Sequence, residues 1–224
     1  MTDTAEGQRA AYQAKLAKFT LLAAIQKMET LSPNLRTNSI SAAAIAAAIL
    51  KKVDMPYRVI VGYTTADGDP RARPHVWLYT QGLPSGDGIT DLVSLAGLDK
   101  QTGKTDSRQV PILGTYMFSH LPHAKRCMYW ATPDPPEGYV VEPGGIPLPV
   151  LASLTANFEM YFIRGSEALR RARDETLEFA FRKGEEKMAE ASERQRQEAA
   201  VAAGETTGAL RMPPAGPGSS LPPQ

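Results

Sequence analysis

The sequence predicts an α+β domain in which a buried helix packs on an antiparallel sheet, with an amphipathic helix before this core and a long charged helix after it. Three stretches predict this class. Residues 41–50 are an uncharged run dominated by alanine and isoleucine, typical of a helix enclosed on all sides. Residues 57–63 are rich in β-branched and aromatic side chains, which favour a strand. Residues 166–203 alternate basic and acidic side chains, which indicates a largely solvated helix.

The first predicted helix covers residues 8–30 and belongs to an N-terminal segment, residues 1–33, that packs on the core. Its apolar side chains recur at helical intervals, so that one face can be buried against other elements. These side chains are Ala14, Leu16, Phe19, Leu22 and Ile25. Pro33 ends the helix, because proline lacks the amide hydrogen that a helix interior needs.

The uncharged helix of the core has clear start and stop signals. Asn38 and Ser39 precede its alanine run and are good N-cap residues. Lys51 and Lys52 close its last turn, where the helix dipole favours cations. The run is too short to span a bilayer, so we expect it to be the buried helix of a globular core.

Three strands are expected after this helix. Turn residues separate them, because Asp67-Gly68-Asp69-Pro70 lies in a polar insert and a loop with proline, serine and glycine follows the second strand. His75 opens the second strand and Asp91 lies in the third. In chain order, the expected elements are the strand at 57–63, the polar insert at 64–74, the strand that begins near His75, the hairpin loop at 83–88 and the strand at 89–95.

Three short motifs in these strands occur in the order of a known family pattern. They are Val61-Gly62-Tyr63, His75-Val76-Trp77 and Thr90-Asp91. Together they resemble the transglutaminase-like core of the papain-like superfamily, whose pattern is a cysteine at a helix start, a strand ending in Gly-Tyr, then His-x-Trp and then Asp. The resemblance covers roughly residues 37–95. It implies that His75 is a general base and that Asp91 orients its imidazole.

The nucleophilic cysteine of that pattern is missing. The only cysteine of the chain, Cys127, lies far downstream of the helix start, and Ser39 or Arg36 takes the nucleophile's place, depending on the spacing used. Arg36 cannot act as a nucleophile because its guanidinium stays protonated in proteins. Ser39 would need a general base and a well-formed oxyanion hole, because its hydroxyl ionises less readily than a thiol. We therefore expect Ser39, His75 and Asp91 to be the vestigial positions of a triad.

The favoured hypothesis is a catalytically inactive module, a pseudoenzyme rather than an enzyme, that acts as a structural or interaction subunit of a larger protein assembly. The stretch from His75 to Thr80 is also similar to degenerate transglutaminase-like domains of ciliary, centrosomal and axonemal proteins. This similarity implies a cytoskeletal role, in a cilium or axoneme, and a vestigial cleft that can still hold a peptide. The alternative is an amide hydrolase or acyltransferase that uses Ser39, His75 and Asp91, or an engineered cysteine-to-serine form of a cysteine enzyme.

No cofactor or metal site is expected. His120 and His123 are close in sequence, but Pro122 separates them and no cysteine or acidic ligand stands beside the pair. The core is assigned to residues 34–165. It includes a stretch rich in proline and glycine, residues 132–149, that predicts an extended surface segment.

The C-terminal part of the chain is expected to contact other proteins. The apolar residues of the charged helix lie mainly in its first half, which predicts that this half docks on the domain or on a partner. They are Leu169, Leu177, Phe179, Phe181 and Met188. Residues 204–224 are mostly proline, glycine, serine and threonine, a composition that buries too little apolar surface to order itself.

Composition narrows the remaining function classes. The chain has 25 lysine and arginine residues against 24 aspartate and glutamate residues, so no basic excess favours nucleic-acid binding. Its 224 residues can hold one core domain of about 150 residues with helical and extended appendages. A single cysteine fits a reducing compartment, and the polar, acidic N-terminus lacks the pattern of a signal peptide. We therefore expect a cytoplasmic protein with no membrane partner.

Overall fold

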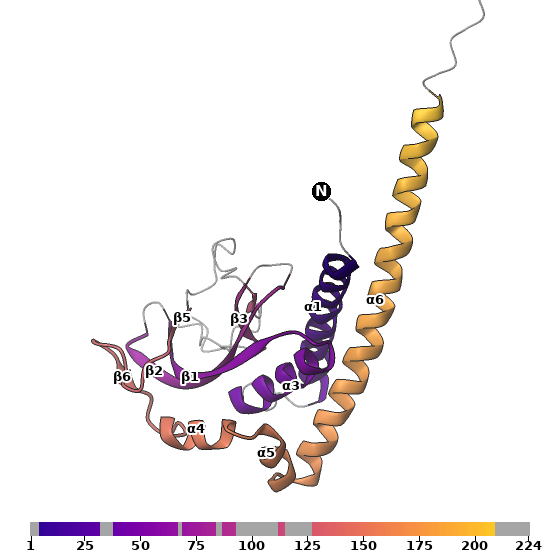
Figure 1. The fold of residues 1–224 in the computed structure, drawn as a ribbon. Helices are drawn as coiled ribbons and strands as arrows, with labels where there is room; N and C mark the ends of the chain where they lie inside the picture. Colours follow the sequence, from indigo (N-terminus) through magenta and orange to yellow (C-terminus); the bar gives the residue numbers. More distant parts are fainter. Residues whose placement is uncertain are drawn as a thin grey trace, which may run out of the picture. The chain divides into compact units, whose positions relative to one another are not determined.

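The structure is a computed structural model, and it describes residues 5–31, 38–66, 69–83, 87–92, 112–114 and 127–208 (Figure 1). Helices and a mainly antiparallel sheet are both present, so the predicted α+β class is confirmed at this level. The chain divides into two compact units, Met1–Glu186 and Lys187–Gln224. Every described strand lies in the first unit.

Helix α1, Ala5–Leu31, is the predicted N-terminal helix and extends it by a few residues at its start. Its buried residues follow spacings of three and four, as one face of a helix requires. They include Ala14, Ala17, Leu21, Ala24 and Met28. Leu22, which the sequence analysis placed on the apolar face, is 38% exposed, because it follows Leu21 by one residue and points away from the buried stripe.

Helix α3, Ser39–Lys52, is the predicted buried helix. Asn38 is its N-cap, and its side-chain oxygen accepts hydrogen bonds from the amides of Ile40 at 3.0 Å and Ser41 at 3.2 Å. Ser39 is the first helical residue, so only Asn38 of the two predicted capping residues acts as the cap. Ten of the fourteen helical residues are buried, as the uncharged run predicts.

The sheet is built on a long antiparallel pair. Strand β1, Tyr57–Ala66, pairs with strand β2, Arg71–Thr80. The polar insert predicted at 64–74 is wrong, because both strands continue into it and Thr64 pairs with Arg73. The prediction failed because the turn residues Asp67-Gly68-Asp69-Pro70 and the nearby Pro74 argue against strands here, and sequence alone does not show which acidic groups neutralise the arginines of β2.

The strand order of the sheet is β4-β3-β2-β1-β5, and β6 pairs with β2 outside this path. Strand β3, Gly88–Asp91, is the predicted third strand, and the residues expected to extend it past 92 lie outside the described residues. Three strands were not predicted, because strands of two to four residues show no clear alternation in a sequence. They are β4 (Ile112–Gly114), β5 (Cys127–Trp130) and β6 (Val140–Val141).

The two faces of the β1–β2 pair have different surroundings. Val76 and Leu78 of β2 belong to the same buried cluster as Ile45 of α3. Successive residues of a strand point to opposite faces. His75 and Trp77 therefore project from the face of the sheet that is turned away from α3.

Two short helices that were not predicted, α4 (Leu148–Thr155) and α5 (Phe158–Arg164), follow the sheet. Figure 1 shows α4 beneath β1 and β2. Asn157 caps α5, because its side-chain oxygen accepts a hydrogen bond from the Met160 amide at 3.2 Å. The prediction of an extended segment at 132–149 agrees with the structure as far as residue 147. Most residues of this stretch are exposed, and its only strand is the short β6.

Helix α6, Glu167–Gly208, is the predicted charged helix and crosses from the first unit into the second. It runs five residues beyond the predicted end, so residues 204–208 are helical rather than part of a tail. The rest of the predicted tail, residues 209–224, lies outside the described residues. No helix in the described ranges combines the length and the apolar content that crossing a membrane requires.

Within the first unit, α6 packs closely on α1. A Cβ atom built at Gly184 of α6 would lie 2.2 Å from the hydroxyl oxygen of Thr20, and Thr20 is fully buried. Lys27 of α1 lies 3.9 Å from Glu175 of α6, measured from Nζ to Oε2. The first half of the charged helix therefore docks on the domain, which is one of the two outcomes predicted from its apolar residues.

Four charged side chains form an ion network at the start of β2. Arg71 Nε donates to Asp69 Oδ1 at 2.9 Å, and Arg73 Nη2 donates to Asp69 Oδ2 at 2.6 Å. Arg73 Nε also donates to Glu142 Oε1 at 3.1 Å. Glu142 directly follows β6, so the network links β6 to β2 and neutralises the two arginines of the strand.

Asp69 is expected to make the protein sensitive to acid. The hydrogen bonds from Arg71, with a further charge contribution from Arg73, hold the pKa of the Asp69 carboxyl well below its ordinary value of 3.8. Because the folded pKa is lowered, this stabilisation is complete above the unfolded pKa of about 3.9 and is lost as pH falls through the folded pKa. Asp69→Asn should lower the free energy of unfolding at neutral pH by about 1 to 2 kcal/mol and should flatten the acid limb of a urea-unfolding pH profile.

The matched control for Asp69→Asn is Asp54→Asn. Asp54 pairs with Arg9 at 3.8 Å, but its side chain is 82% exposed, so its ion pair is screened by solvent. We expect Asp54→Asn to change the free energy of unfolding by less than about 0.5 kcal/mol. An unchanged acid limb in Asp69→Asn would contradict the role assigned to the ion network.

Candidate functional site

The structure brings His75 and Asp91 together on one face of the sheet. Leu78 of β2 pairs with Thr90 of β3, so the residues on either side of this pair, Trp77 and Asp91, face each other on the opposite side of the sheet. His75 Nε2 lies 2.7 Å from Asp91 Oδ2. The two side chains are only 5% and 3% exposed, so the pair is buried.

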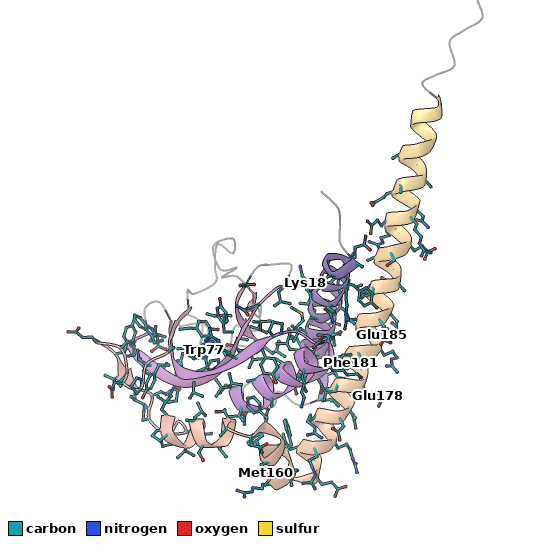
Figure 2. The ribbon with its side chains drawn as sticks, in the orientation of Figure 1. Lys18, Trp77, Met160, Glu178, Phe181 and Glu185 are labelled. Carbon is teal, nitrogen blue, oxygen red and sulfur yellow. The ribbon has the colours of Figure 1, made fainter. Side chains whose placement is uncertain are left out.

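Two aromatic side chains surround this pair. The hydroxyl of Tyr129 on β5 donates to Asp91 Oδ2 at 2.8 Å, so the same carboxylate oxygen contacts both His75 and Tyr129. The ring of Trp77 stacks on the imidazole with 6.3 Å between centroids, and Tyr129 meets Trp77 edge-on at 5.1 Å. Figure 2 shows Trp77 on the side of the sheet away from α4. We refer to His75, Trp77, Asp91 and Tyr129 as the His75 cluster.

Tyr129 was missed by the sequence analysis. Its strand follows a long stretch without a confident pattern, and its four residues are too few to reveal alternation. The signal that could have found it is the Met128-Tyr129-Trp130 run, which concentrates strand-forming aromatic residues.

The glycine of the Gly-Tyr motif has a steric role beside the His75 cluster. Gly62 lies opposite His75 in the β1–β2 register. A Cβ atom at Gly62 would lie 2.1 Å from the backbone oxygen of Trp130 and 2.9 Å from Cη2 of Trp77. Only glycine therefore allows β5 and the Trp77 ring to approach β1 this closely.

Ser39, the third predicted triad residue, lies apart from the His75 cluster. It opens α3, which packs against the Val76 and Leu78 face of the sheet, whereas His75 projects from the other face. Among the described residues, no hydrogen bond joins Ser39 to His75 or Asp91. Arg36, the other predicted occupant of the nucleophile's place, lies outside the described residues.

The N-terminus of α3 is closed by groups of the chain itself. The Asn38 side chain accepts from the Ile40 and Ser41 amides, as described above, and its Nδ2 donates to the hydroxyl of Tyr161 at 3.3 Å. The Ser41 hydroxyl also lies 3.3 Å from the Tyr161 hydroxyl. Amides that could bind a developing oxyanion at a helix N-terminus are here used for capping.

The backbone register places the only cysteine away from His75, although Cys127 is two residues from Tyr129 on β5. Cys127 pairs with Ala66 at the end of β1, whereas His75 pairs with Gly62. At about 3.3 Å per residue, the four positions from Gly62 to Ala66 span about 13 Å along the strand. Cys127 therefore pairs with β1 at a position displaced along the strand from the one opposite His75.

Metal ligation has no support in the described part of the chain, where no group of three or more histidine, cysteine, aspartate or glutamate side chains is placed to hold an ion. His120 and His123 lie outside that part.

Comparison with protein-family models, with curated proteins and with solved structures gives no match for this chain. The likeness to the transglutaminase-like core thus remains a prediction from the three motifs.

The His75 cluster has the chemistry of an oriented base. Asp91 engages Nε2 of the imidazole and fixes its orientation, which leaves Nδ1 as the nitrogen that can exchange a proton with another group. Acyl transfer needs, in addition, a nucleophile within hydrogen-bonding range and donors for the oxyanion. Ser39 does not meet the first requirement, and the capped start of α3 does not meet the second.

Proposed function

We propose that this chain is a catalytically inactive, transglutaminase-like module that serves as a structural or interaction subunit of a larger protein assembly. The observation that carries the proposal is the position of Ser39 relative to the buried His75–Asp91 pair, on opposite faces of the sheet. In this arrangement the pair stabilises the fold through Trp77 and Tyr129, and it has no hydroxyl of Ser39 to activate.

The C-terminal helix is the surface that we assign to partner proteins. The part of α6 in the second unit is helical as far as Gly208. Charged pairs lie along its surface, such as Lys187 and Glu190, whose Nζ and Oε2 atoms are 2.7 Å apart. Val201 is 61% exposed on this helix, which gives a partner an apolar contact among the charges. A cytoskeletal or axonemal assembly is the setting that the motif resemblance suggests.

One observation favours the alternative, an amide hydrolase or acyltransferase. The 2.7 Å contact between His75 Nε2 and Asp91 Oδ2 is the geometry in which a carboxylate orients a general base. For this function, the Ser39 hydroxyl at the start of α3, or another nucleophile, would have to reach Nδ1 of His75 in a second conformation. The two functions therefore differ in a measurable way, which is turnover that depends on both Ser39 and His75.

The deciding experiment is an activity assay on the purified full chain. Glutamine-containing peptides, an amine donor and an acylating active-site probe are incubated with the wild type, Ser39→Ala and His75→Gln, and an active transglutaminase serves as the positive control. We expect no turnover and no probe labelling in any of the three proteins. Ser39→Ala leaves the Asn38 cap in place, so its fold should persist in circular dichroism. Wild-type turnover that is lost in both variants would overturn the proposal.

A further inference from the structure

A cavity of about 500 Å³ lies between α1 and the end of β2, away from the His75 cluster. Its volume falls within the range of small-molecule sites. Its wall is largely apolar and comes from three alanines and a phenylalanine on α1, with two lysines and a glycine completing it. These residues are Ala10, Ala11, Ala14, Lys15, Lys18, Phe19 and Gly82.

The two lysines give this cavity a positive charge. Lys15 and Lys18 are three residues apart on α1, so their side chains leave the same side of the helix, and both are half-buried. Within the described residues, neither has an acidic partner, whereas Lys27 pairs with Glu175. Two cationic side chains that are half-buried beside an apolar wall offer a place for an anion with an apolar part.

We propose that this cavity binds an amphipathic organic anion of the fatty-acid class. The hydrocarbon chain contacts Ala10, Ala14 and Phe19, and the carboxylate lies between Lys15 and Lys18. A bare inorganic anion would leave the apolar wall exposed to water, and a neutral lipid would leave both ammonium groups uncompensated.

The lysines hold the carboxylate without help from the backbone of the turn. The amide of Gly82 donates to Asp87 Oδ1 at 2.6 Å and is therefore already used. Affinity should accordingly depend on the two ammonium groups and on ionic strength. This inference does not rest on the proposed function, because it involves no residue of the His75 cluster.

The test is titration calorimetry of the full chain with dodecanoate below its micelle concentration, compared with dodecanol and dodecylamine. We expect saturable binding of one dodecanoate per chain, about tenfold weaker binding of dodecanol, and no binding of dodecylamine. Lys15→Gln combined with Lys18→Gln should weaken dodecanoate binding by about tenfold or more and should leave dodecanol binding unchanged.

Two controls separate this site from general surface adsorption. Lys51→Gln removes one charge from an exposed position of α3 and should leave dodecanoate binding unchanged. Ala11→Trp places a large ring in the cavity from an exposed position and should abolish binding of both dodecanoate and dodecanol, with helix content retained in circular dichroism. Absent saturable binding, equal affinity for dodecanoate and dodecanol, or equal dodecanoate affinity in the lysine double variant would each overturn the proposal.

Discussion

Asp91→Ala is expected to lower the free energy of unfolding by about 3 to 5 kcal/mol. The Asp91 carboxylate contacts His75 Nε2 at 2.7 Å and accepts from the Tyr129 hydroxyl at 2.8 Å, and its side chain is 3% exposed. Its removal takes away the acceptor of the buried imidazole and one acceptor of the partly buried Tyr129 hydroxyl, and a buried polar group left without its partner costs about 1 to 3 kcal/mol. Urea unfolding followed by tryptophan fluorescence measures the loss, because Trp77 lies in the His75 cluster.

A double-mutant cycle shows whether this loss comes from the pair itself. Asp91→Leu combined with His75→Phe removes both polar partners and keeps a ring that can stack on Trp77. We expect the double variant to be more stable than the sum of the two single losses predicts, by about 1 to 3 kcal/mol. Replacing both members of a buried pair by apolar groups is commonly far less damaging than removing one member.

The outcome also bears on the proposed function. A large loss in Asp91→Ala with no change in an activity assay is expected of a pair that stabilises the fold. A loss no larger than that of the exposed control Asp54→Asn would mean that the pair is not structural. In that case, the general-base alternative for His75 would gain support, since the pair would have no other evident use.

The long helices α1, α3 and α6 and most of the central strand pair were predictable because their signals are local. The alanine run and the Asn38 cap specify α3 within a few residues, and β-branched side chains specify β1. The start of β2 could not be predicted, because it depends on residues that are distant in sequence. Arg71 and Arg73 fit a strand only because Asp69 and Glu142 neutralise them, and Glu142 comes from a segment about seventy residues away in sequence.

The candidate site shows the same division between local and distant information. Three motifs predicted that His75 and Asp91 would meet, and the β2–β3 register brings them to 2.7 Å. The position of Ser39 could not be predicted, because a motif does not state on which face of the sheet the helix packs. Tyr129 could not be predicted either, since its hydrogen bond to Asp91 depends on β5 pairing with β1.

Gly184→Ala is expected to lower the free energy of unfolding by about 2 kcal/mol, although alanine is the better helix former by about 1 kcal/mol. The new Cβ atom would lie 2.2 Å from Thr20 Oγ1 and 3.2 Å from Thr20 Cα, so the Thr20 side chain must rotate in a buried site or α1 and α6 must move apart. Movement of these helices would also weaken the packing of Ala180, which is fully buried on α6. Ala11→Gly, at an exposed position of α1, serves as the control for helix propensity. This change should lower the free energy of unfolding by about 1 kcal/mol, which is the difference in helix propensity between alanine and glycine.

The sign of this effect should change when Thr20 is shortened. Within the described residues, the Thr20 hydroxyl is buried without a hydrogen-bond partner, so Thr20→Ala alone should be neutral or stabilising. In that background the 2.2 Å contact is gone, and Gly184→Ala retains only tight contacts of 3.2 Å with Cα and Cβ. The double variant is therefore expected to regain most of the stability lost in Gly184→Ala. Equal destabilisation by Gly184→Ala with threonine or alanine at position 20 would refute the role of the Thr20 hydroxyl, and no destabilisation in either background would refute the close packing of α1 on α6.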